Sequence, residues 1–218
     1  MFFPRWRQGE HVTIIAPTGG GKTTLEVALI PRRSHSIFFA TKRDDPLYRD
    51  LIRHYGFVRV EQFSEILPTH NKVLLWPRHK DTIRNTTRWQ QYVFTDALNQ
   101  IVKQKSWTVW FDECKYMVQM LGMGPEVTFA NEQLRSTNGT IINAAQRPRW
   151  IGKSALSNAS HVFLWKTTDA EDTRTLSEVG GINAREVARM SQSLGKHEFI
   201  YIQTRGSESR LYRSQVRK

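Results

Sequence analysis

A glycine-rich turn near the start of the chain carries the residue types that bind a nucleoside triphosphate. An apolar run, residues 11–16, leads through this turn to a lysine and two threonines. Glycines adopt backbone angles closed to other residues, so successive N–H groups can converge on phosphates. The lysine would reach the β- and γ-phosphates, and the threonine after it would ligate Mg²⁺. The pattern predicts an ATP and Mg²⁺ site that includes Ala16, Pro17, Thr18, Gly19, Gly20, Gly21, Lys22, Thr23 and Thr24.

Two acidic residues follow a second apolar run, residues 107–111. At the end of a strand, Asp112 would hold Mg²⁺, and Glu113 would polarise the water that attacks the γ-phosphate. An ordinary strand with a polar end fits the same residues. The phosphate-binding pattern upstream favours the catalytic interpretation.

A glutamine follows a third apolar run, residues 140–145. If this strand lies beside the one that ends in Asp112, the amide of Gln146 would touch both the γ-phosphate and the water. It would then sense the state of the nucleotide. The alternative is a glutamine that only caps its strand.

The elements that must position these residues alternate along the chain. Apolar strand-like runs are separated by helical stretches, which is typical of a mostly parallel sheet with helices on both faces. Further strands are predicted at residues 36–40, 57–60, 72–76, 161–165 and 198–202. Helices are predicted at residues 23–30, from Asp45-Pro46 onward, and at 89–105 and 126–135. We expect one α/β domain over residues 1–204 and a basic tail or small hairpin over 205–218.

Composition limits the class of protein. The 218 residues carry a formal net charge of +12, which favours a polyanionic partner such as nucleic acid, although a basic surface also aids solubility. One cysteine, Cys114, excludes a disulfide framework and indicates a reducing interior. No apolar run approaches the ~20 residues of a membrane span. We therefore expect a soluble protein of the cytoplasm.

Several segments resemble the FtsK–HerA superfamily of DNA-pumping ATPases. They are the glycine-rich turn, the Trp-Phe-Asp-Glu run at 110–113, and residues 138–148, whose strand ends in Gln-Arg-Pro. Residues 167–176 with the glycine pair at 180–181 resemble the FtsK branch as well. The resemblance covers roughly residues 9–204. It implies a RecA-like P-loop core that assembles into a ring, a hexamer or pentamer, around double-stranded DNA.

The resemblance also implies an arginine finger that acts across a subunit interface, where such a residue speeds hydrolysis by ~10³–10⁵. Arg135 stands at the matching position, with Arg147 or Arg149 as substitutes. A solvated arginine at a helix end, where a cation suits the helix dipole, is the alternative interpretation of Arg135.

The short single domain resembles the genome-packaging ATPases of tailless or lipid-containing viruses and small phages. We therefore expect an ATP-driven translocase of double-stranded DNA in the host cytoplasm or associated with the virion, with a capsid vertex or portal-like protein as a further partner. The alternatives are a Zot-like conjugation or phage-assembly ATPase, a non-motor ATP-dependent switch, and a small-molecule kinase. The first alternative is weaker because Zot-like proteins usually carry a membrane segment. The second is disfavoured because a switch would not need Glu113, Gln146 and a finger arginine together. The third would need a lid domain, and the sequence shows no segment for one.

Contacts to DNA would come from basic residues, because sequence-independent pumping depends on phosphate contacts. Residues 76–89 could form a pore-facing loop, and residues 122–125 a second moving loop. Trp6 would stack on adenine or lie in the core. The candidate phosphate contacts, which a solvated basic surface explains equally well, are Arg78, His79, Lys80, Arg84, Arg88, Arg205, Arg210, Arg213, Arg217 and Lys218.

Overall fold

A computed structural model describes residues 6–176, 179, 182–204 and 209–216. The glycine pair at 180–181 and three of the candidate DNA contacts, Arg205, Arg217 and Lys218, lie outside the described residues. In the described part, no helix is both long enough and apolar enough to cross a membrane.

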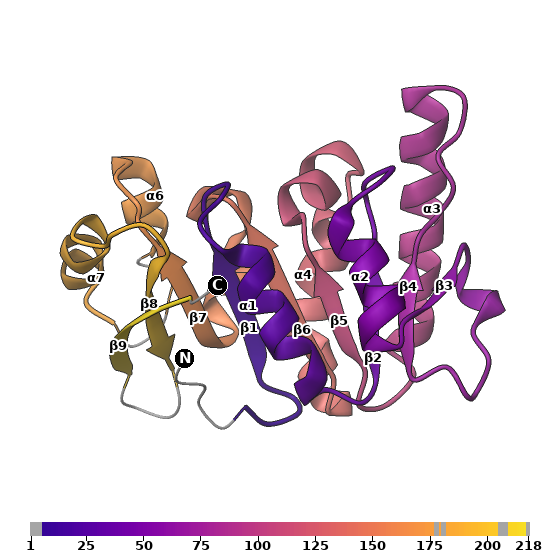
Figure 1. Ribbon diagram of the computed structural model, residues 1–218, viewed down its shortest axis with the longest axis horizontal. Helices are drawn as coiled ribbons and strands as arrows, with labels where there is room; N and C mark the ends of the chain where they lie inside the picture. Colours follow the sequence, from indigo (N-terminus) through magenta and orange to yellow (C-terminus); the bar gives the residue numbers. More distant parts are fainter. Residues whose placement is uncertain (1–5, 177–178, 180–181, 205–208, 217–218) are drawn as a thin grey trace.

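One sheet runs through the whole molecule (Figure 1). The described residues give it nine strands in the order β3-β4-β2-β5-β6-β1-β7-β8-β9. Pairing is parallel from β3 to β7, and β8 and β9 are antiparallel additions at one edge. The strands are β1 His11–Ile15, β2 Ser36–Phe39, β3 Val58–Val60, β4 Lys72–Leu75, β5 Thr108–Phe111, β6 Thr140–Ala145, β7 Ala159–Trp165, β8 Glu198–Gln203 and β9 Arg210–Gln215.

Helices cover both faces of the sheet, as the alternating pattern predicted (Figure 1). Apolar residues of α1 and α2 pack on one face, and those of α3, α4, α5 and α7 pack on the other. The α-helices are α1 Lys22–Leu29, α2 Pro46–Tyr55, α3 Ile83–Ile101, α4 Gly124–Gln133, α5 Lys153–Ser157, α6 Ala170–Thr175 and α7 Ala184–Gln192. Shorter helical turns are Ile30–Arg32, Phe63–Glu65, Tyr116–Met120, Leu134–Thr137 and Pro148–Trp150.

The strands are buried on both sides, which explains why they read as continuous apolar runs. In β5, Val109 and Phe111 join the cluster under α3 and α4, while Trp110 joins the cluster under α1 and α2. A shift by one residue would exchange the side chains that pack under α1 and α2 with those that pack under α3 and α4.

Helix α3 begins earlier than predicted. Thr82 caps it by accepting a hydrogen bond from the N–H of Asn85 at 3.1 Å, and the buried Thr86 and Gln90 then face inward. The expectation of a loop over residues 76–89 is therefore wrong for residues 83–89. The buried polar side chains of Thr86 and Gln90 interrupt the apolar periodicity of this face, so the sequence pattern does not reveal the first turns of the helix.

The last described strand belongs to the same sheet as the rest of the chain. β9 pairs antiparallel with β8, from Glu198 opposite Gln215 to Gln203 opposite Arg210. Residues 210–215 thus form the second arm of a β8–β9 pair at the edge of the α/β sheet.

Candidate nucleotide site

The carboxyl ends of β1, β5 and β6 bring the predicted site residues together. β6 lies between β1 and β5, with Ala145 opposite Ile15 and Asn143 opposite Phe111. The residues that follow these parallel strands therefore meet at one edge of the sheet. The prediction that the glutamine-bearing strand lies beside the strand of Asp112 is confirmed.

A pocket of about 430 Å³ opens at this edge. Most of the predicted nucleotide-binding residues line it, together with the side chains of Glu113 and Gln146. Asp112, only 2% exposed, lies behind this lining. The pocket residues are Ala16, Pro17, Thr18, Gly19, Gly21, Lys22, Thr23, Thr24, Lys42, Glu113, Gln146, Lys196, His197 and Val216.

The turn between β1 and α1 has the backbone that phosphate binding requires. Gly19 and Gly21 have φ angles of 73° and 110°, a left-handed region that glycine enters without strain. Gly21 is the residue before α1, so the free N–H groups of the first helical turn open directly onto the pocket. Free amides at a helix start, with the helix dipole behind them, form an anion site.

Lys22 joins this turn to the acidic strand end. Its ammonium is in close contact with the Asp112 Oδ1 and lies 3.3 Å from the backbone oxygen of the same residue. Glu26, one helical turn further along α1, lies 3.6 Å from the ammonium. The phosphate-binding turn and the carboxylates of β5 therefore form one site.

Comparisons with known proteins identify solved structures that share this fold. No protein-family model matches the chain, and no curated protein sequence matches it significantly. Among solved structures, the DNA-packaging ATPase B204 of Sulfolobus turreted icosahedral virus is 17% identical, with a TM-score of 0.66 and coverage of 97% of this chain and 100% of that one.

Two further solved structures share the fold. The genome packaging NTPase B204 of Sulfolobus turreted icosahedral virus 2, in complex with AMPPCP, is 14% identical, with a TM-score of 0.63 and coverage of 93% and 96%. The pCW3 conjugation coupling protein TcpA is 12% identical, with a TM-score of 0.57, and the match covers 94% of this chain and 60% of TcpA. The chain has the fold of these P-loop ATPases.

Within this P-loop ATPase fold, Lys42 is a site residue that the sequence prediction missed. It follows β2, and its ammonium lies 3.5 Å from Asp112 Oδ2, 3.3 Å from Glu113 Oε1 and 2.8 Å from Asp45 Oδ2. Burial lowers the pKa of Lys42, but the hydrogen bond to Asp45 and the charge of Glu113 outweigh it and raise the pKa overall. The signal available in the sequence was a basic residue shortly after a predicted strand, residues 36–40.

Glu26 is a buried acid beneath the turn. It is 1% exposed, and its carboxylate oxygens accept no hydrogen bond from the described residues. Burial raises its pKa, and the charges of Lys22 and Lys42 oppose that shift.

The Cys114 thiol, next to Glu113, is also buried, which raises its pKa to about 12 and keeps it protonated at neutral pH.

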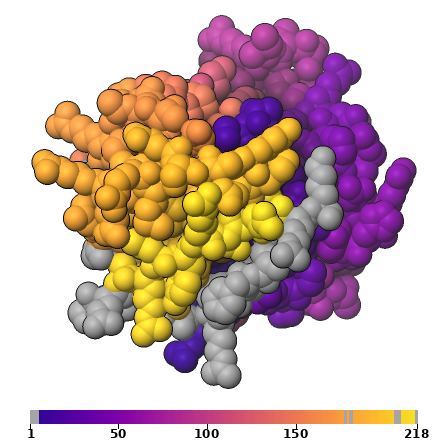
Figure 2. Space-filling model, turned by 60° about the vertical axis from the view of Figure 1, so that its left-hand side comes forward, coloured from indigo at the N-terminus to yellow at the C-terminus, as the bar shows by residue number. Residues whose placement is uncertain are grey.

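The end of the chain forms another wall of the pocket that the sequence prediction missed. The indole N–H of Trp165 donates to the carbonyl of Gly20 at 2.7 Å, and the His197 Nδ1 lies 3.1 Å from the same oxygen. Val216 binds back through its N–H to the His197 carbonyl at 3.0 Å. Figure 2 shows the orange and yellow carboxyl-terminal part of the chain beside indigo residues of its amino-terminal part. These contacts join residues too far apart in sequence to form a motif.

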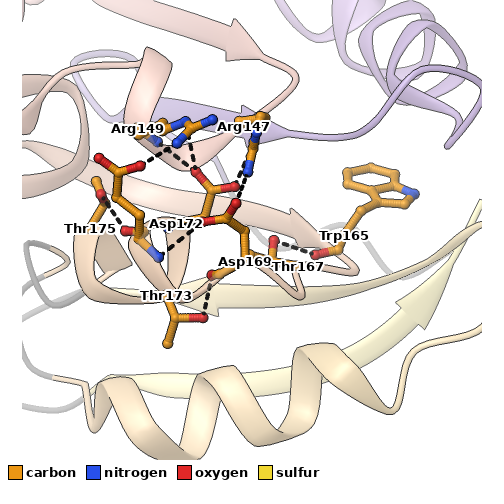
Figure 3. A network of polar contacts seen from close by, with 9 residues as sticks. Arg147, Arg149, Trp165, Thr167, Asp169, Asp172, Thr173 and Thr175 are labelled. Carbon is orange, nitrogen blue, oxygen red and sulfur yellow. Dashed lines mark hydrogen bonds and ion pairs between the residues drawn. The ribbon is translucent and has the colours of Figure 1, made fainter.

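Two arginines that follow Gln146 are held by acids of the α6 region (Figure 3). Arg147 donates through Nε to Asp172 at 2.7 Å and contacts Asp169, while Arg149 contacts Glu171. Asp169 also caps α6, accepting from the N–H groups of Glu171 and Asp172. In this chain, both substitute finger arginines therefore make ion pairs within the subunit.

Arg135 lies away from the pocket, at the edge where β1, β6 and β7 begin. Its Nε donates to the Gly9 carbonyl at 3.1 Å, and its NH2 group donates to the Asn158 carbonyl at 2.8 Å and to Ser160 at 3.2 Å. A finger would act on the site of another subunit, so the assignment stays a prediction. The same contacts give Arg135 a role within its own subunit.

Trp6 also lies outside the pocket lining. The Arg33 guanidinium stacks 3.7 Å from the centre of its ring, and its indole N–H donates to the Glu10 carbonyl at 2.9 Å. Its environment is an arginine-stacked edge of the core, and these contacts give it no role in stacking on adenine.

Proposed function

We propose that the protein hydrolyses ATP to move double-stranded DNA, as a genome-packaging motor. The observation that carries this proposal is the meeting of Lys22, Asp112 and Glu113 at one edge of the sheet, with Gln146 in the same pocket. Together, these residues provide a phosphate cradle, a metal-binding acid, a base and a sensor.

Each residue has a distinct task in this proposal. Lys22 binds the β- and γ-phosphates. Glu113 polarises the attacking water, and Gln146 orients it. Both side chains line the pocket, within reach of a nucleotide in the turn.

The oxygen donors around the turn fit Mg²⁺, which prefers carboxylates, hydroxyls and water. Thr23 presents an exposed hydroxyl to the pocket, and Asp112 lies against Lys22. These two residues would hold the ion. When bound, Mg²⁺ neutralises charge that develops on the phosphates.

The neighbours support the DNA part of the proposal. B204 is a DNA-packaging ATPase, and it matches this chain along nearly the full length of both proteins. TcpA is a conjugation coupling protein, so a conjugation motor is the second candidate. We place the protein in the host cytoplasm, as a hexameric or pentameric ring that acts on double-stranded DNA and docks on a capsid vertex or portal-like protein.

ATP turnover with and without double-stranded DNA tests the proposal. We expect DNA to stimulate the wild-type rate, Lys22→Ala to lose ATP binding or turnover, and Glu113→Gln to bind ATP without turning it over. Glu132→Gln removes an exposed carboxylate from α4 and is the matched control, with an unchanged rate. Normal turnover by Glu113→Gln would remove Glu113 as the base, and a rate that DNA leaves unchanged would overturn the motor function.

A further inference from the structure

A second polar pocket lies where the end of β2 meets the start of α3. Its volume is about 320 Å³, and it shares no lining residue with the nucleotide pocket. The lining brings together basic and hydroxyl side chains from three parts of the chain. It consists of Arg43, His79, Lys80, Asp81, Thr82, Ile83, Thr86, Thr87 and Tyr116.

The charge of this pocket favours an anion. Arg43 and Lys80 are exposed, and neither forms an ion pair with an acid among the described residues. Asp81 is the acid in the lining, and its Oδ1 already accepts from the N–H of Thr82 at 3.0 Å and from Asn85 at 3.1 Å. The pocket therefore contains two cations and one carboxylate, and that carboxylate is already hydrogen-bonded to the first residues of α3 and the residue before it.

The loop that carries Lys80 is fixed to the first turns of α3. The N–H of Lys80 donates to the hydroxyl of Thr86 at 2.9 Å, and that hydroxyl donates back to the Lys80 carbonyl at 3.3 Å. The Lys80 ammonium lies 4.7 Å from the centre of the Trp89 ring. The loop is thus held in place before a ligand arrives, so less conformational entropy is lost on binding.

His79 presents a donor because Gln90 fixes its tautomer. The Thr41 carbonyl can only accept, so the NH₂ end of the Gln90 amide must face it, at 3.0 Å. The same NH₂ group lies 3.3 Å from His79 Nε2, which must therefore be an acceptor. A neutral His79 then carries its proton on Nδ1, for which the described residues provide no hydrogen-bond acceptor.

Gln90 also connects this pocket to the nucleotide site. It is fully buried, and its amide oxygen accepts from the Tyr116 hydroxyl at 2.8 Å. Its NH₂ group donates to Thr41, which immediately precedes Lys42, and the Lys42 ammonium lies against Asp112 and Glu113. A ligand that displaces His79 or Tyr116 would therefore act on the residue next to Lys42.

We propose that this pocket binds a backbone phosphate of the nucleic acid on which the motor acts. The inference rests on the proposed function and identifies where the DNA is held. Cations and hydroxyls suit a phosphodiester, which carries one negative charge and several acceptor oxygens. The Lys80 ammonium covers the indole of Trp89, and the hydroxyl of Tyr116 is engaged by Gln90.

The test compares two double variants that each remove one arginine and one lysine charge. Arg43→Gln with Lys80→Gln changes the pocket, and Arg53→Gln with Lys103→Gln changes exposed cations of α2 and of the turn after α3. Binding of a fluorescent 20-base-pair duplex is measured against salt concentration, and ATP binding is measured alongside. We expect the pocket variant to bind DNA about 10-fold more weakly and to lose up to about 1.8 from the slope of log affinity against log salt. The control should stay near wild type, and ATP affinity should hold in both.

The outcomes separate the site from the proposed function. Equal losses in the two double variants, or none in the pocket variant, would overturn the site while the motor function stands. A wild-type protein that binds no duplex would overturn the DNA function itself. Inorganic phosphate serves as the probe for a free anion: if the pocket variant loses phosphate binding but keeps its duplex affinity, the nucleic-acid assignment is wrong.

Tyr116→Phe tests the link to the nucleotide site, because it removes one hydroxyl and keeps the ring. We expect a smaller stimulation of ATP turnover by DNA, measured at a duplex concentration that saturates the variant. Full stimulation in this variant would show that the hydrogen bond to Gln90 carries no signal.

Discussion

Alanine at Gly21 would test the contact between the phosphate-binding turn and the end of the chain. Gly21 has a φ of 110°, and a Cβ built on it would lie 2.4 Å from Cγ2 of Val216. Gly19, in the same turn, has a φ of 73°, and a Cβ at that position would meet no atom within 4 Å. Both glycines therefore have a positive φ that disfavours other residues. Only Gly21 also has no room for a side chain.

The size of each effect follows from this geometry. An alanine in the left-handed region costs about 1–2 kcal/mol, and forcing a methyl group into a packed contact adds about 1–3 kcal/mol. We expect Gly19→Ala to lower the free energy of unfolding by about 1–2 kcal/mol and Gly21→Ala by about 2–5 kcal/mol. In Val216→Ala the clashing Cγ2 is gone, and the next atom, Cβ, lies at an ordinary contact distance of 3.5 Å.

Urea unfolding of the nucleotide-free protein measures these differences in a double-mutant cycle. Val216→Ala should relieve the steric part of the Gly21→Ala loss, giving a coupling of about 1–3 kcal/mol, and should not relieve Gly19→Ala. If Gly21→Ala is no more destabilising than Gly19→Ala, or if the coupling is absent, the chain end does not pack on the turn.

Three other substitutions give further predictions. Lys42→Met removes a cation from the nucleotide pocket. Calorimetry should show the Kd for ATP rise about 10- to 100-fold and the Kd for AMP rise less. Equal rises in the Kd for ATP and for AMP would argue against a contact between Lys42 and the terminal phosphate. Burial and the charge of Arg135 lower the pKa of His11 to about 4 from 6.5, so the unfolded chain takes up a proton first as the pH falls. The contribution of His11 to the free energy of unfolding should thus be constant above pH 6.5 and fall by about 3 kcal/mol toward pH 4. His11→Gln should flatten this dependence on pH. Arg135→Ala should bind ATP but hydrolyse little. Mixing it with Glu113→Gln should restore turnover if the arginine acts across subunits. If mixing does not restore turnover, Arg135 acts within its own subunit, through its contacts to Gly9 and Asn158.

The parts of the molecule that sequence could predict are those determined locally. The turn at Gly19–Gly21, the strand before it and the strand that ends at Asp112 are each visible as a short run of residue types. The place of Gln146 followed from the rule that parallel strands end at a common edge, and the pairing of β5 with β6 confirms it.

The parts that sequence could not predict depend on contacts between distant segments. His197 and Val216 reach the turn because β8 and β9 extend the sheet beside β7. Nothing in the residues around them signals a phosphate site. Lys42 is similar, since its position next to Asp112 depends on β2 lying beside β5, a pairing that the order of strands along the chain does not reveal.

The pairing of charges in the nucleotide pocket indicates how Mg²⁺ and ATP would bind together. Lys22 contacts Asp112, and Lys42 lies between Asp112, Glu113 and Asp45, so the cations that would bind phosphate are paired with acids. A triphosphate alone would draw these lysines away and leave carboxylates beside its own negative charge. Mg²⁺ would compensate the carboxylates at the same step, because a divalent ion replaces the charge of two ammonium groups. ATP binding should therefore weaken more on Mg²⁺ removal in the wild type than in Asp112→Asn, where less acidic charge needs compensation.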